Sequence, residues 1–316
     1  MTSISLLPNT IDHQEDSPLF SDLPSEIRNT IFELALTAQH DEKRPYRADR
    51  AFYRPGYLAH TQINCSLLLT CKRAYFEARL FPLSANEHVF WLFNGPWKSI
   101  GKQSRHTANW AAWYSRLNED QKTSIGEIHI FVQQFHLEAL GNRGDIGPLD
   151  LSAKRLHLTL RHSDWWSWES PPNSSDRLGI CPWRTERTSH HQTIAEPEQP
   201  DINYIRERMT PETWGGQLSQ VKGLEVLEIE FETDLNKKEQ LEVVVARAKH
   251  WKFPLANGTV LEWTGQQKDY SWEGLKYLKD DGQMLRESPI SRHALKRKYE
   301  VTTLTWKALP ATHLVM

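Results

Sequence analysis

Two short apolar stripes at helical spacing, separated by a long insertion, set the strongest constraint on the fold of this 316-residue chain. In the first stripe, Ile27, Ile31 and Leu34 recur on one face of a helix, and Arg28 falls on the other face. Pro24 suits the first turn, where its missing N–H costs nothing. A helix this short gains little from its own backbone hydrogen bonds, so it must pack on its neighbours.

The second stripe follows the insertion, which runs from residue 37 to residue 64. Cys71, Tyr75 and Ala78 repeat the helical period, and residues 88–93 then form an apolar run typical of a strand. A thiol on such a stripe is expected to be buried and inert. The two stripes therefore predict a small helical module that leads directly into a sheet.

The letters of these segments resemble an F-box. The matching blocks are LPSEIRNTIFELAL (23–36), LLLTCKRAYFEARLF (67–81) and NEHVFWLF (86–93), and together they look like the F-box-like module that opens many proteins of filamentous fungi. The resemblance implies docking to a Skp-family adaptor of a ubiquitin ligase through Leu23, Pro24, Ile27 and Ile31. The connection between the two helices is longer than in an ordinary F-box.

Composition places the protein inside the cell. The 38 basic and 40 acidic residues leave a net charge of −2, which gives no field for nucleic acid or anionic lipid. Three cysteines make neither a disulfide framework nor a structural zinc site. No apolar run approaches the ~20 residues of a membrane span, and the polar N-terminus does not resemble a signal peptide. We therefore expect the cytoplasm or the nucleus, with no membrane partner.

The boundaries follow from changes in pattern. We expect a flexible leader over residues 1–18, the F-box-like module over 19–95 and a mixed α/β domain over 96–316. The insertion at 37–64 interleaves arginines with aromatic residues, a composition that can contact single-stranded nucleic acid, but a partly ordered surface loop is the preferred interpretation. The overall class is α+β.

Alternating apolar residues predict the strands of the second domain. They lie at residues 128–132, 156–160, 224–232, 260–263 and 301–306, with helical stripes at 110–117, 210–221 and 236–251. We expect a mixed sheet with helices packed on one of its faces. Glu228, Glu230 and Glu232 alternate with apolar residues and are interpreted as the solvated side of their strand.

A long polar segment, residues 164–209, interrupts this rhythm and is treated as a loop inserted between core elements. It contains Trp165, Trp166 and Trp168. Exposed aromatic side chains of this kind anchor partner proteins or stack on sugars. Burial within the fold explains them equally well, so partner binding and burial both remain open, with a small-molecule site as a third reading.

Motifs for enzyme chemistry are missing from the sequence. There is no glycine-rich phosphate loop and no Gly-x-Ser-x-Gly elbow, and none of the 14 histidines forms the His-Glu-x-x-His pattern of zinc hydrolases. His157 lies on the polar side of a predicted strand, where a solvated imidazole is expected. A basic cluster at residues 292–298 is typical of either a nuclear localisation signal or a solvated helix face. We expect no cofactor, no metal and no catalytic residue.

Three hypotheses follow from the sequence. The first is a non-enzymatic interaction protein, in which the module docks to the adaptor and the second domain, with its tryptophan loop, holds an unidentified protein substrate. The second is a small-molecule-binding protein or enzyme of a specialised fungal pathway that uses the C-terminal domain. In the third, the module is only a structural cap on a larger complex, a reading that the long insertion favours.

Overall fold

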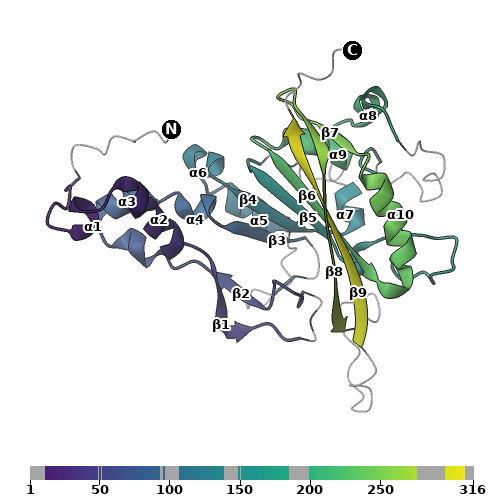
Figure 1. Ribbon diagram of the computed structural model, residues 1–316, viewed down its shortest axis with the longest axis horizontal. Helices are drawn as coiled ribbons and strands as arrows, with labels where there is room; N and C mark the ends of the chain where they lie inside the picture. Colours follow the sequence, from purple (N-terminus) through teal and green to yellow (C-terminus); the bar gives the residue numbers. More distant parts are fainter. Residues whose placement is uncertain are drawn as a thin grey trace.

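The structure is a computed structural model in which a small helical module is joined to a curled, seven-stranded mixed sheet (Figure 1). This arrangement confirms the α+β class and the mixed sheet. The residues that the structure describes are 11–48, 50, 52–92, 95–96, 107–138, 149, 151–184, 199–275 and 296–309.

The helical module lies at one end of the long axis of the molecule (Figure 1). It consists of α1 (Pro18–Ser21), α2 (Ser25–Ala35), the 3-10 helix η1 (Cys65–Leu69), α3 (Lys72–Ala78) and α4 (Phe81–Ser84). Its small core contains Phe20, Phe32, Leu36, Ala74 and Ala78.

The second helix of the module begins later than its apolar stripe predicts. Cys71 is the N-cap of α3, and its Sγ accepts a hydrogen bond from the backbone N–H of Ala74 at 3.4 Å. The expectation of a buried Cys71 on a helical stripe is therefore wrong, because the chain is extended at that residue and its side chain is only half-buried.

The described residues of the insertion at 37–64 form two strands and contribute buried side chains, which goes beyond the partly ordered surface loop that was expected. It begins and ends in an antiparallel hairpin of β1 (Gln39–Pro45) and β2 (Ala59–Gln62). Between these strands, Phe52 is 8% exposed and Arg54 is 2% exposed. An arginine is buried to this extent only when it finds carboxylate partners, and those partners lie on the sheet.

The sheet combines parallel and antiparallel pairing. The four strands β3, β4, β5 and β6 are parallel to one another, whereas β9, β8 and β7 continue the sheet in antiparallel fashion. In spatial order the strands are β3 (Glu87–Trp91), β4 (Glu127–Phe131), β5 (Arg155–Leu160), β6 (Val226–Asp234), β9 (Lys296–Leu309), β8 (Val260–Leu275) and β7 (Lys252–Pro254). All five predicted strands of this domain are confirmed.

One face of the sheet carries the main hydrophobic core. Leu227, Ile229 and Phe231 of β6 are at most 1% exposed there, and they belong to the same cluster as Leu241 and Val244 of α10. The helices of this domain are α5 (Thr107–Tyr114), α6 (Glu119–Thr123), α7 (Gln134–Glu138), α8 (Ile202–Arg208), α9 (Trp214–Gln217) and α10 (Lys238–Ala248).

Parts of the predicted loop and leader are structured. Within 164–209 the chain forms helix α8, so the expectation of a structureless segment is wrong there, while residues 185–198 lie outside the described part. Ile11, in the expected flexible leader, is 5% exposed, and residues 1–10 are not described. Of the basic cluster, Lys296 begins strand β9 rather than lying on a helix, and residues 292–295 are not described.

Candidate functional site

An apolar face of α2 is exposed to solvent. We call Pro24, Ile27, Ile31 and Leu34 the α2 apolar face; Ile27 is 49%, Ile31 39% and Leu34 68% exposed, and Pro24 is exposed as well. Leu23, which precedes this face, is half-buried. These side chains share one side of the helix because they recur every three or four residues.

The opposite side of α2 faces the module core, which corrects the orientation expected from the sequence. Phe32 is fully buried, and Arg28, expected in solvent, is 8% exposed. The guanidinium of Arg28 donates from Nε to Glu77 of α3 at 2.8 Å and from Nη1 to the carbonyl oxygen of Leu23 at 2.7 Å. This ion pair fastens α2 to α3 and turns the α2 apolar face outward.

Other exposed apolar side chains lie on the same module. Leu69 at the end of η1 is 86% exposed and Tyr75 of α3 is 44% exposed. Five of the ten large apolar side chains that are exposed among the described residues thus belong to α2, η1 and α3. Such concentration in a small module is typical of a surface that meets another protein.

The three tryptophans of the predicted partner site do not form one surface. Trp165 is 2% exposed, and its Nε1 donates to the backbone oxygen of Glu232 at 2.8 Å, so burial explains this residue. Trp166 is 39% exposed and its Nε1 donates to Glu138 of α7, whereas Trp168 is half-buried. In Figure 1, α7 lies far from α2, so the structure does not bring Trp166 together with the α2 apolar face.

The face of the sheet opposite the main core is polar and largely covered. Its side chains come from alternate positions of four parallel strands, because successive residues of a strand point to opposite faces. The register aligns Glu87 with Glu127 and Arg155, and in the next row His129 with His157 and Glu228. Sequence reasoning missed this alignment, since periodicity alone does not give strand order.

Arg54 of the insertion neutralises the middle of this polar face. Its Nη2 lies 2.5 Å from Glu230 Oε1 and 3.2 Å from Glu232 Oε2, and it also contacts the hydroxyl of Tyr270 at 3.2 Å. The two glutamates are 7% and 3% exposed, so their interpretation as solvated residues is wrong.

The positive charge of Arg54 lowers the pKa values that burial alone would give to Glu230 and Glu232. Burial, the largest single influence, raises the pKa of Glu230, but the guanidinium of Arg54 acts with His157, His129 and Tyr270 to bring that pKa below its ordinary value. For Glu232 burial dominates and the pKa is raised, with Arg54 offsetting part of the effect. A buried, charged carboxylate needs such a cation nearby.

Beside Arg54, a carboxylate, an imidazole and a hydroxyl are arranged in line. His129 Nδ1 lies 2.8 Å from Glu87 Oε1, and His129 Nε2 lies 2.8 Å from Thr159 Oγ1. Nucleophilic catalysis uses this order of groups. However, Thr159 is fully buried, and the hydroxyl of Tyr57 lies 2.5 Å from His129 Nδ1.

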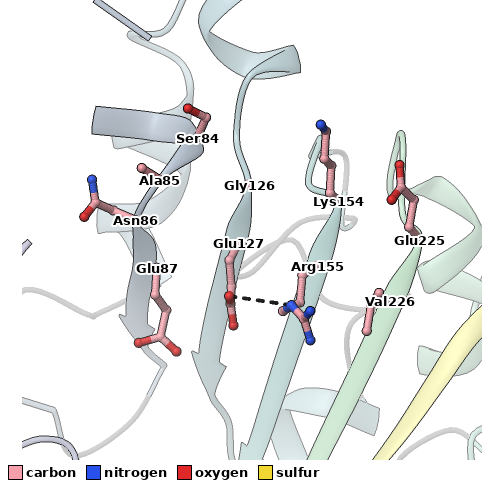
Figure 2. A pocket seen from close by; sticks show the side chains of 10 residues that line it. All are labelled: Ser84, Ala85, Asn86, Glu87, Gly126, Glu127, Lys154, Arg155, Glu225 and Val226. Carbon is pink, nitrogen blue, oxygen red and sulfur yellow. Dashed lines mark ion pairs between the residues drawn. The ribbon is translucent and has the colours of Figure 1, made fainter. Parts of the chain in front are cut away.

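At the amino-terminal edge of the parallel strands this polar face opens into a cavity of about 280 Å³. Figure 2 shows Glu87, Glu127 and Arg155 pointing the same way from β3, β4 and β5. Burial, reinforced by the charge of Glu87, raises the pKa of Glu127 to about 7.

Below this edge, His157 is largely enclosed rather than solvated as expected. Its Nε2 is buried without a hydrogen-bond partner among the described residues. Burial, together with the neighbouring His129, lowers the pKa of His157 to about 3. The imidazole is therefore neutral at neutral pH, with one of its two ring nitrogens unprotonated.

A signal for this site exists in the sequence. The acidic alternation of residues 228–232 and the basic, aromatic composition of residues 44–57 are complementary in charge, which points to contact between them. His157 and Trp165 lie on opposite faces of the sheet, because Trp165 packs against Phe231 in the main core.

Comparison of the chain with known protein families, with curated proteins and with solved structures gives no significant match. Among the described residues, no helix has the length and apolar character needed to cross a membrane.

Proposed function

We propose that the protein is a non-enzymatic interaction protein that docks through the α2 apolar face to a Skp-family adaptor of a ubiquitin ligase. The observation that carries the proposal is the outward orientation of Ile27, Ile31 and Leu34 on a helix whose other side is fixed in a core. A rigid helix with an exposed apolar stripe is suited to packing against helices of a partner.

The F-box resemblance of residues 23–36 and 67–81 gives the partner class. The residues that it implicates include Pro24, Ile27 and Ile31, which are exposed and share one face. Leu23 is half-buried, so we assign it to orienting the start of α2 through its carbonyl contact with Arg28.

The C-terminal domain is proposed to hold the protein substrate. Trp166 is the member of the tryptophan group that retains an exposed surface suited to this role. The buried, covered state of Thr159 argues against nucleophilic catalysis at the neighbouring His129, which favours binding over chemistry in this domain.

A binding measurement with a purified fungal Skp-family adaptor tests the proposal. Ile27→Asp and Ile31→Asp should each weaken adaptor binding at least tenfold, because each places a charge in an apolar interface. Val243→Asp on α10 is the matched control, since Val243 is 48% exposed against 49% for Ile27. Thermal unfolding of each variant shows that the fold is retained.

Either of two results overturns the proposal. The intact chain does not bind the adaptor at concentrations of tens of micromolar, or the two α2 variants bind it as tightly as the Val243→Asp control does.

A further inference from the structure

The buried Nε2 of His157 lacks a partner among the described residues, and such an atom requires an explanation. Leaving a buried polar atom unpaired costs about 1–3 kcal/mol. Two carboxylates flank the imidazole: Glu228 is its register neighbour on β6, and Glu127 lies one row away on β4. A ring nitrogen of His157 and one oxygen from each carboxylate all lie within 4.8 Å of one another.

We propose that Glu127, His157 and Glu228 bind a divalent transition-metal ion, with Zn²⁺ as the ion that their donor atoms fit best. Neutral imidazole nitrogen and carboxylate oxygen are both zinc ligands, at about 2.0–2.2 Å, and a mixed nitrogen and oxygen set favours zinc over magnesium or calcium. This site lies on the sheet, apart from the α2 apolar face, and does not depend on adaptor docking.

Three protein ligands leave one position open in a tetrahedral zinc site. Ligand atoms of such a site are about 3.4 Å apart, given zinc–ligand distances near 2.1 Å. Separations of up to 4.8 Å therefore close by about 1 Å or a little more when the ion binds, which rotation of the two glutamate side chains can supply. The adjoining cavity lets water reach the edge that Glu127 lines.

A second group, Glu87, His129 and His157, lies within the same distance limit but fits an ion less well. The rings of His129 and His157 are stacked 3.8 Å apart at an interplanar angle of 12°. Lone pairs of stacked imidazoles run parallel within the ring planes, so they do not converge on one ion. Both nitrogens of His129 are also engaged, by Glu87 and by Thr159.

In this structure the guanidinium of Arg155 is the cation that pairs with both carboxylates of the proposed metal site. Its Nη1 lies 3.0 Å from Glu228 Oε1, and its Nε lies 3.7 Å from Glu127 Oε2. The side chain is 37% exposed, so it can swing into solvent when an ion takes over both carboxylates. Arg155 is thus a competitor of the metal, and its removal should strengthen binding.

Metal titration of the full chain, stripped with chelator, tests the site. Co²⁺ alone is added first and followed by its visible absorption, and Zn²⁺ then displaces it to give the zinc affinity. Glu127→Gln, Glu228→Gln and His157→Gln should each weaken binding at least tenfold, whereas Arg155→Met should tighten it severalfold. Glu225→Gln is the control, because Glu225 lines the same cavity but its carboxylate points in the opposite direction from that of Glu127 in Figure 2.

Comparison between variants separates this site from histidines elsewhere in the chain. The expected result is one bound ion whose affinity falls in the ligand variants, rises in Arg155→Met and is unchanged in Glu225→Gln. If binding is undetectable, or if Glu127→Gln and Arg155→Met both leave the affinity at the wild-type value, the site does not exist. The gain expected for Arg155→Met cannot arise from misfolding.

Discussion

Replacing Arg54 with methionine tests the idea that the insertion is fixed to the sheet by buried charge. The substitution keeps the apolar stem of the side chain and removes the cation that serves Glu230 and Glu232. Breaking a buried ion pair at one partner costs about 3–5 kcal/mol, because the remaining charge is left uncompensated.

The structure places Arg54→Met near the lower end of that range. Tyr270 still donates to Glu230 Oε2 at 3.2 Å, and Trp272 still donates to Glu232 Oε2 at 3.0 Å, so neither carboxylate is wholly unpaired. Loss of the cation–π contact with Phe131, 5.4 Å from the guanidinium carbon to the ring centre, adds roughly 1 kcal/mol. We expect a loss of about 3–4 kcal/mol in the free energy of unfolding at neutral pH.

Urea denaturation at two pH values measures this loss. Without Arg54 both carboxyl groups have raised pKa values, so they take up protons as the pH falls and no longer need a cation. The deficit of the variant should therefore be smaller at pH 5 than at pH 7.5. Adding Glu230→Gln and Glu232→Gln to Arg54→Met should restore part of the stability, because the uncompensated charges are removed.

Arg44→Met is the matched control for Arg54→Met. Arg44 belongs to the same insertion, but its side chain is 63% exposed and it pairs with Asp41 at the surface, so its replacement should cost at most about 1 kcal/mol. A loss for Arg54→Met no larger than that of Arg44→Met would refute the reasoning.

Two further predictions concern α2 and a buried histidine. Phe32→Ala should lower the free energy of unfolding by about 3–5 kcal/mol, while Ile31→Ala, one residue away on the exposed side, should cost less than about 1 kcal/mol; equal losses in urea denaturation would contradict the orientation of α2. Burial lowers the pKa of His162 to about 4, and its Nδ1 accepts from the Asp234 backbone N–H at 3.2 Å, so its stabilising contribution is present above pH 6.5 and is lost as the pH falls through 4. His162→Asn keeps a hydrogen-bond acceptor but does not titrate. Between pH 7 and pH 4 the wild type should therefore lose up to about 3 kcal/mol more free energy of unfolding than the variant does. If the two proteins lose the same amount, the assignment is wrong.

The strands were predictable because their signal is local. Alternation at residues 156–160 and 224–232 identifies β5 and β6, and it also identifies which residues share a face. The order of the strands was not predictable, since it depends on pairing between segments far apart in the chain. The two rows that place Glu127 beside Arg155 and His157 beside Glu228 therefore became visible only in the folded sheet.

The sequence by itself determined that residues 25–35 form an amphipathic helix and that the glutamates of β6 share one face. Only the tertiary structure decided which side of each is covered. In α2 the side that carries Phe32 and Arg28 faces inward, where Arg28 pairs with Glu77, and on β6 the cation for Glu230 comes from Arg54, 176 residues away in the chain. The periodicity of a sequence segment shows which of its side chains share one face of a helix or strand. Whether a polar face is buried depends on a complementary charge that a distant segment supplies.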